Sequence, residues 1–140
     1  MMDLSQALEV ARATKQSVLV TIRSNGLPQL SNVLHHTDAH GVIRISTTAD
    51  RAKYVNLTRR PWAALKVGDN FWSYAVLEGD VELSKIATAP DDATVEELIT
   101  LYRDQAGEHP DWDEYRAAMV ADQRLVIRLK PNRAYGGAVR

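Results

Sequence analysis

The segment that decides the fold runs from Ser17 to His36 and reads SVLVTIRSNGLPQLSNVLHH. Its first part, Ser17–Arg23, is mostly apolar and β-branched, which is typical of a strand. The Asn25-Gly26 pair that follows is a strong signal for a tight turn between antiparallel strands. The segment Gln29–His36 is then predicted to return beside the first strand. This hairpin is the clearest in the chain, and it indicates a β-sheet protein.

The same patterns predict the elements further along the chain. Strands are expected at 42–47, 62–67, 71–84 and 124–130, with a turn at 68–70, a bend or bulge at Gly79, and Pro131 ending the last strand, after which no periodicity is present. Helices are expected after Ser5, at 50–60 capped by Asp50, at 90–106 with Pro90 in its first position, and at 111–121 capped by Asp111. The sequence therefore predicts a single domain over residues 1–140, a mainly β, six-stranded antiparallel barrel with peripheral helices.

Composition narrows the possible functions. The chain has 140 residues, a formal net charge of −1 and no cysteine. Disulfides, thiolate metal sites and cysteine nucleophiles are therefore excluded, and the absence of a basic field argues against nucleic acid as a partner. The sequence has no run of about 18 apolar residues and no secretory signal pattern, so we expect a cytoplasmic protein that does not enter a membrane.

The segment Ile45–Leu57 places two cations where a helix normally prefers acids. Arg51 and Lys53 fall in the first turn predicted after Asp50, where the helix dipole is already positive. Backbone N–H groups, hydroxyl groups and two basic side chains converge there, which suits a phosphate or another polyanionic group. The alternative is that Arg51 and Lys53 are solvated surface residues paired with Asp50.

Four motifs taken together resemble one known family. They are the hairpin segment 25–33, the Ser46-Thr47 to Leu57 segment with its Arg51-Ala52-Lys53 step, the segment Pro61–Leu65, and the segment Trp72–Gly79. With the helical block 89–112, they resemble the split β-barrel flavin and deazaflavin reductases, the superfamily named for pyridoxamine 5′-phosphate oxidase. The resemblance covers nearly the whole chain and is closest to the branch that uses the deazaflavin coenzyme F420.

This resemblance implies a homodimer with two cofactor sites between its barrels. It implies that Arg51 and Lys53 bind the cofactor phosphate and the acidic oligoglutamate tail beyond it. The other cofactor-binding residues implied are Gln29, Ser31 and Asn32 along the tricyclic ring, Ser46, Thr47 and Thr48 as hydroxyl donors, and Trp72 and Tyr74 from the second subunit. The implied function is hydride transfer from reduced F420 to a small organic acceptor that the sequence does not identify. No acid–base residue is assigned.

Two other functions stay open at this point. An FMN-dependent oxidase or reductase would use a related Ser-Arg-Lys step, although the Arg-x-His substrate clamp of the parent oxidase is absent. A cofactor-binding carrier without turnover would need the same binding residues. A metal site is not expected, because adjacent His35 and His36 point to opposite faces of a strand, and His40 and His109 add no known ligand spacing.

Overall fold

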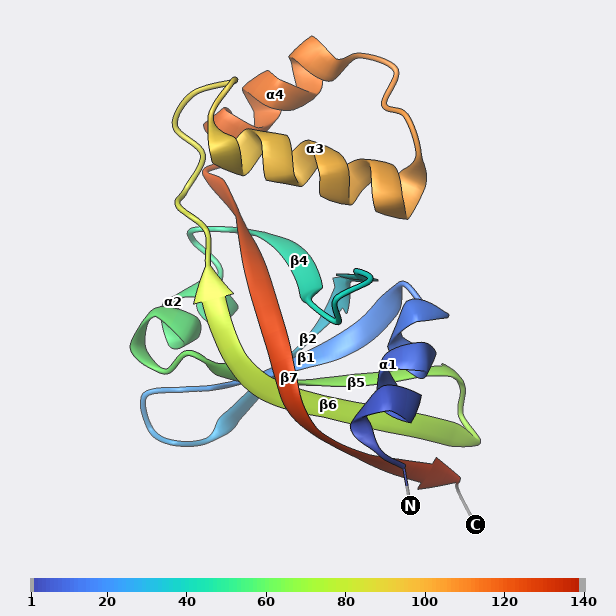
Figure 1. Ribbon diagram of the computed structural model, residues 1–140. Helices are drawn as coiled ribbons and strands as arrows, with labels where there is room; N and C mark the ends of the chain where they lie inside the picture. Colours follow the sequence, from blue (N-terminus) through green and yellow to red (C-terminus); the bar gives the residue numbers. More distant parts are fainter. Residues whose placement is uncertain (1, 139–140) are drawn as a thin grey trace.

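A computed structural model describes residues 2–138 and shows one curled, fully antiparallel sheet with helices at its ends (Figure 1). The strand order is β2-β1-β5-β6-β7-β4-β3. The strands are β1 (Gln16–Ile22), β2 (Pro28–Leu34), β3 (His36–Thr37), β4 (Ile43–Thr48), β5 (Trp62–Asn70), β6 (Ser73–Leu83) and β7 (Arg124–Ala138). The helices are α1 (Leu4–Arg12), α2 (Ala52–Arg59), α3 (Ala93–Ala106) and α4 (Trp112–Ala121). The predicted mainly β class is confirmed.

The sheet closes into a barrel that stays split along one side. β2 and β3 are at opposite ends of the strand order, yet only His35 separates them along the chain. The sheet must therefore curl until its two ends approach each other, which leaves β2 facing β4 without a ladder between them. Six strands were predicted, and the described residues form seven. The predicted strand 29–36 is interrupted at His35 and divides into β2 and β3.

The last strand is much longer than predicted. Pro131 was expected to end it, but β7 continues beside β6 to Ala138. The register shifts opposite Gly79, so that Gly79 pairs with Pro131 and Glu78 with Arg133. This confirms the irregularity predicted at Gly79, and the bulge accommodates a proline that cannot donate a ladder hydrogen bond. β5 likewise continues through the predicted turn to Asn70.

Three helix starts also differ from prediction. Asp3, rather than Ser5, caps α1, since its carboxylate accepts from the backbone N–H of Gln6 and the Gln6 side chain accepts in return. Asp92, rather than a turn opened by Pro90, caps α3. Arg51, rather than Asp50, is the N-cap residue of α2, and no described side chain caps that helix. Asp111 caps α4 as predicted.

The core has two parts. The main cluster fills the barrel with residues of the strands and with Ala7 and Ala11 of α1. A second cluster, which includes Val95, Leu98, Tyr115 and Met119, packs α3 and α4 against Val126 of β7. The pair α3–α4 therefore covers one end of the barrel, at the top of Figure 1.

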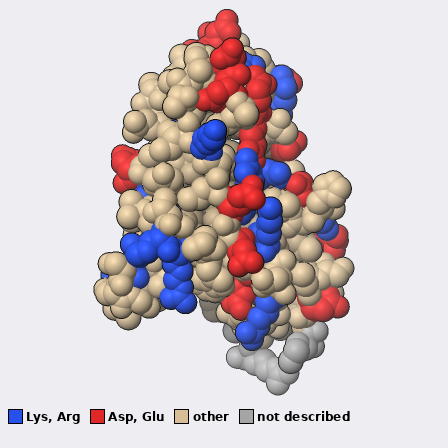
Figure 2. All heavy atoms as spheres, turned by 60° about the vertical axis from the view of Figure 1, so that its left-hand side comes forward, with Lys and Arg blue, Asp and Glu red and all other residues tan. Residues whose placement is uncertain are grey.

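Ion pairs join α3 to the sheet. Glu97 of α3 accepts from Arg44 of β4 and from Arg128 of β7, two residues that face each other in the ladder. Arg128 also pairs with Glu82 of β6. Acidic and basic side chains consequently alternate in a band down one face of the molecule (Figure 2). These ion pairs therefore attach α3 to β4 and β7 at one end of the barrel.

Candidate cofactor site

A polar cavity of about 230 Å³ lies in the split of the barrel. We call it the split cavity; it lies between β2 and β4, at the start of α2, and its lining residues are Asn32, Val33, Ser46, Thr47, Thr48, Arg51, Lys53 and Arg124. Six of these eight were predicted from the sequence as cofactor-binding residues. Three are cations, and none of the described lining residues carries a carboxylate. The arrangement suits an anion with several oxygens.

Arg124 is the cation that sequence reasoning missed. It begins β7 and pairs with Thr48 in the ladder, which places it beside the hydroxyl-rich end of β4. Its Nη1 donates to the Oγ of Ser46 at 3.2 Å. The signal in the sequence was an arginine at the start of the last strand, but its neighbours in the sheet lie almost 80 positions away, and no local pattern reveals that contact.

Two residues that line this cavity carry a buried polar atom without a partner within the described part of the chain. The two atoms are the Oγ1 of Thr47 and the Nε of Arg124. Buried polar groups without a partner are rare in folded proteins, and each costs free energy. A phosphate binds through N–H donors and hydroxyl groups of this kind, and the residues that line the cavity supply both. The residues present therefore fit an anionic group of a cofactor.

The electrostatics of Lys53 agree with this geometry. Burial lowers the pKa of Lys53 below its usual value, and the positive charges of Arg51 and Arg124 lower it further. Three cations held this close repel one another, so an anion between them relieves the repulsion. The uncapped start of α2 adds the positive end of the helix dipole. Asp50 offsets only part of this charge: its exposed carboxylate accepts from the Oγ1 of Thr48, and the positive charges of Arg51 and Arg124 help to lower its pKa.

The predicted residues of β2 do not all reach the split cavity. Side chains alternate along β2, so that Gln29, Ser31 and Val33 are partly buried while Asn32 is exposed. Asn32 lines the cavity, but Gln29 and Ser31 are not among its lining residues. The Oε1 of Gln29 accepts from the Nδ2 of Asn56 at 3.0 Å, a contact that ties β2 to α2.

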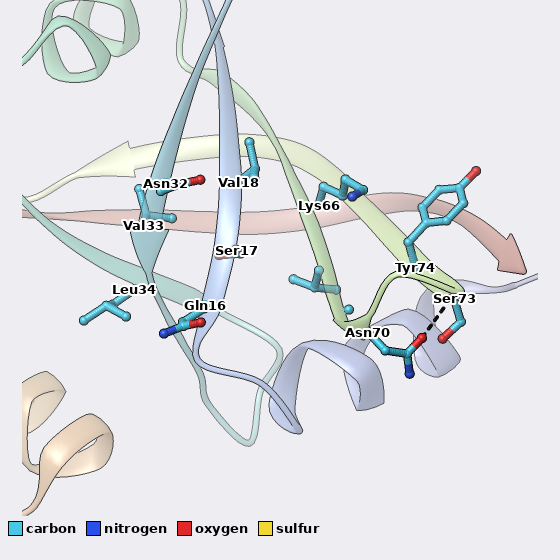
Figure 3. Close-up of a pocket in the computed structure, with 12 residues that line it drawn as sticks. Gln16, Ser17, Val18, Asn32, Val33, Leu34, Lys66, Asn70, Ser73 and Tyr74 are labelled. Atoms are coloured by element: carbon cyan, nitrogen blue, oxygen red, sulfur yellow. Dashed lines mark hydrogen bonds between the residues drawn. The ribbon is translucent and has the colours of Figure 1, made fainter. Parts of the chain in front are cut away.

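A larger cavity of about 520 Å³ shares lining residues with the first, and Figure 3 shows the residues around it. Asn32 and Val33 line both, so the two cavities meet across β2. The larger one also contains Tyr74 and Lys66, whose Nζ lies 5.9 Å from the centre of the Tyr74 ring. Tyr74 therefore lines the larger cavity but not the split cavity, and Figure 3 shows it on the opposite side from Asn32 and Val33. Trp72 lies outside this lining and is 67% exposed, in edge contact with Phe71.

The predicted histidine arrangement can also be placed. His35 is fully buried, where its Nε2 lies 2.9 Å from the carbonyl oxygen of Ala11 and its Nδ1 lies 2.7 Å from the Oγ of Ser17. His36 lies near Asp104 instead. Within residues 2–138 the structure contains no cluster of histidine, aspartate and glutamate side chains arranged to hold a metal ion, and no helix there is long and apolar enough to cross a membrane.

A barrel split along one side, with a basic cavity in the split, is the arrangement expected of the split β-barrel flavin and deazaflavin reductases. The family model described as pyridoxamine 5′-phosphate oxidase matches residues 5–136, so the chain belongs to that family. The family membership and the split-barrel fold predicted from the sequence are both confirmed, and the chain is a member of an oxidoreductase family that binds flavin-type cofactors.

Solved structures support the same fold. A conserved hypothetical protein from Mycobacterium tuberculosis is similar with a TM-score of 0.72 and 20% identity, over 99% of this chain and 86% of its own. A protein named F420 reductase is similar with a TM-score of 0.66 and 25% identity, over 91% of this chain and 94% of its own. A pyridoxamine 5′-phosphate oxidase-related, FMN-binding protein from Nostoc punctiforme has a TM-score of 0.58 and 17% identity, over 98% of this chain and 94% of its own.

Proposed function

We propose that this chain is a cytoplasmic, homodimeric oxidoreductase that binds coenzyme F420 and passes a hydride from the reduced deazaflavin to a small organic acceptor. The observation that carries the proposal is the split cavity, which is lined by Arg51, Lys53 and Arg124 and by Thr47, and in which Thr47 and Arg124 each carry a buried polar atom without a partner among the described residues. A neutral or cationic ligand would leave that charge uncompensated. The cofactor phosphate, followed by its acidic tail, supplies the charge that the cavity lacks.

The similarity to the F420 reductase favours the deazaflavin over FMN. That protein is 25% identical to this chain over almost the full length of both. The FMN-binding protein is 17% identical, a level at which only the fold is shared. FMN remains the second candidate, because its phosphate would meet the same three cations.

Binding, orientation and shielding are the tasks left to the protein. Reduced F420 supplies a hydride when bound, so this chain needs only to hold the donor carbon near an acceptor and to keep water away. The adjoining cavity at Asn32, Lys66 and Tyr74 offers room beside the anion site for the ring or for the acceptor. We assign no acid–base residue to the reaction.

A second subunit would complete this site. Leu30 and Leu34 of β2, on either side of Asn32, are 62% and 56% exposed, and Trp72 extends from the β5–β6 turn. Exposed apolar side chains gathered beside a cavity are typical of a protein interface. We therefore propose that a second copy of the chain covers β2 and brings its own Trp72 and Tyr74 to the cofactor.

A titration of the purified protein with F420 and with FMN tests the cofactor. We expect saturable F420 binding, measured by fluorescence, that the double variant Arg51→Ala, Lys53→Ala weakens at least tenfold. Arg60→Ala is the matched control, because it removes a charge of the same sign from the other end of α2. Tight FMN binding without F420 binding would overturn the cofactor assignment.

Turnover separates an enzyme from a carrier. Reduced F420 and the protein are incubated with quinones, tetrapyrroles, enones and nitroaromatic compounds, and oxidation of the cofactor is followed by absorbance. Faster oxidation with at least one acceptor than in the absence of protein is the expected result. Tight binding without any turnover would instead identify a cofactor carrier.

A further inference from the structure

A separate cavity of about 210 Å³ lies behind Arg124, between the sheet and the pair α3–α4. We call it the helix cavity; its lining residues are Ser46, Leu98, Leu101, Tyr102, Gln105, Tyr115, Met119 and Arg124. Ser46 and Arg124 also line the split cavity. The two cavities are therefore neighbours that share Arg124. The proposed function involves the split cavity but not the helix cavity.

Two nitrogen atoms mark the helix cavity as a binding site. Among the described residues, the buried side-chain nitrogens without a hydrogen-bond partner are the Nε2 of Gln105 and the Nε of Arg124. Both residues line this cavity. A buried N–H group without an acceptor is unfavourable. The two residues that carry these groups line one small cavity, which suits a ligand with acceptor oxygens.

The remaining lining defines the rest of that ligand. The hydroxyl group of Tyr115 is already engaged, since it donates to the carbonyl oxygen of Leu98 at 3.0 Å. The rest of the lining is mostly apolar or aromatic and comes from Leu98, Leu101, Met119 and the two tyrosine rings. Arg124 is the one charged group among the described lining residues. The cavity thus combines a positive, donor-rich end with an apolar body.

The volume limits the size of the ligand. Sites for drug-sized ligands are larger, at about 300–1,000 Å³. A tricyclic cofactor ring is therefore too large for this space, and a compound with a single aromatic or branched aliphatic group fits it better.

We propose that the helix cavity binds a small carboxylic acid, with its carboxylate between the Gln105 amide and the Arg124 guanidinium and its apolar body against Leu98 and Tyr102. This acid and an anion in the split cavity would compete for the charge of Arg124. Binding of the acid in the helix cavity should then weaken anion binding in the split cavity, and the converse must hold by linkage. The competition rests on the proposed function, whereas the binding of the acid does not.

Benzoate is the probe for the site, and NMR on the cofactor-free protein is the measurement. We expect saturable shifts of the Arg124 Nε–H signal, the Gln105 side-chain amide signals and the indole N–H signal of Trp112, whose ring lies 5.5 Å from that of Tyr115. Benzamide, which has the same shape without the charge, should bind at least tenfold more weakly. Signals that stay unmoved at the highest benzoate concentration would show that the cavity does not bind the acid and would overturn the proposal. Equal binding of benzamide would overturn the assignment to an acid.

A pair of variants on α3 locates the probe. Gln105→Leu replaces the amide by an apolar group of similar size and should weaken benzoate binding at least tenfold. Thr100→Val is the control, since Thr100 lies on the same helix but lines a different cavity. Equal loss in both variants, or no loss in either, would place benzoate elsewhere and overturn the proposal.

Inorganic phosphate tests the competition. Phosphate should bind the wild-type protein, lose affinity in the double variant Arg51→Ala, Lys53→Ala, and bind at least threefold more weakly when benzoate is saturating. If phosphate does not bind while benzoate does, the proposed cofactor site fails and the acid site stands. If both bind without affecting each other, the shared role of Arg124 is wrong.

Discussion

At the scale of single residues, the positive charges of Arg51, Lys53 and Arg124 favour an anionic ligand in the split cavity. Arg51 and Lys53 come from the start of α2, and Arg124 comes from the far end of the chain. Their mutual repulsion is a cost that the folded protein carries without its ligand. Such a site is arranged for binding rather than for stability, and this difference can be measured.

The double variant Arg51→Ala, Lys53→Ala should therefore fold at least as well as the wild type without cofactor. Removing two cations from the positive end of α2 should leave the free energy of unfolding unchanged or raise it, by up to about 1 kcal/mol. Thermal unfolding of the cofactor-free proteins checks this. A clear loss of stability combined with unchanged cofactor affinity would show that these residues are structural.

His35 gives the stability a pH dependence of known sign. A carbonyl oxygen can only accept, so the Nε2 of His35 donates to Ala11, and in the neutral ring the Nδ1 accepts from the hydroxyl group of Ser17. Burial lowers the pKa of His35 below its ordinary value of 6.5, and the bond to Ala11 opposes this only in part. As the pH falls, the unfolded chain therefore binds a proton at a higher pH than the folded protein does. Stability is lost as the pH falls below 6.5 toward the folded pKa.

Urea unfolding at pH 7.5, 6.5 and 5.5 measures that loss. The wild type should become less stable at each step, and His35→Gln should show a flatter pH profile even if it is less stable overall. His40→Gln, a substitution of an exposed histidine, should keep the wild-type slope. Identical slopes in all three proteins would contradict the role given to His35.

At the scale of elements, the β6–β7 pair depends on one glycine. A Cβ atom built on Gly79 would lie 2.2 Å from the carbonyl oxygen of Lys130 and 2.8 Å from the Cα of Pro131. These are backbone atoms, which cannot move aside without breaking the ladder. Gly79 therefore permits the bulge through which β7 passes Pro131 and continues to Ala138.

The substitution Gly79→Ala should destabilise the protein by about 1–3 kcal/mol, the range for overpacked sites. Gly137→Ala is the matched control on the same pair of strands, because Gly137 pairs with Tyr74 and a Cβ atom added to it would meet no described atom within 4 Å. Chemical denaturation of both variants compares them. Equal stability of the two variants would mean that β7 can shift its register freely.

Prediction from sequence succeeded for elements whose signals are local. The Asn25-Gly26 turn, the Asp111 cap and the irregularity at Gly79 each depend on a few neighbouring residues, and all three are confirmed. The prediction that Pro131 ends the last strand was wrong, because whether a proline ends a strand depends on its partner across the sheet. That partner lies about 50 positions earlier in the chain.

At the scale of the whole molecule, the exposed face of β2 determines the proposed assembly. Leu30 and Leu34 offer apolar surface beside the split cavity, and a second copy of the chain would cover it. The double variant Leu30→Glu, Leu34→Glu should place four like charges in a two-fold interface and produce a monomer. Light scattering coupled to size exclusion measures the mass.

Val55→Glu is the control for this prediction, since Val55 is a half-exposed apolar residue on α2. It should leave the dimer intact. The monomeric variant should also bind F420 more weakly, because the cofactor would lose contacts from the second subunit. A wild-type protein that is monomeric at all concentrations would contradict the proposed homodimer.

The sequence by itself determined the hairpin, the barrel class and the two cations at the start of α2. The hairpin and the two cations follow from periodicity, turn chemistry or charge within about a dozen residues, and the barrel class follows from the succession of strands along the whole chain. Only the tertiary structure decided that Arg124 joins Arg51 and Lys53, that Gln29 turns to Asn56, and that a second cavity lies behind the first. The physical reason is that these contacts arise from the curl and register of the whole sheet, which bring together residues that carry no local sign of one another.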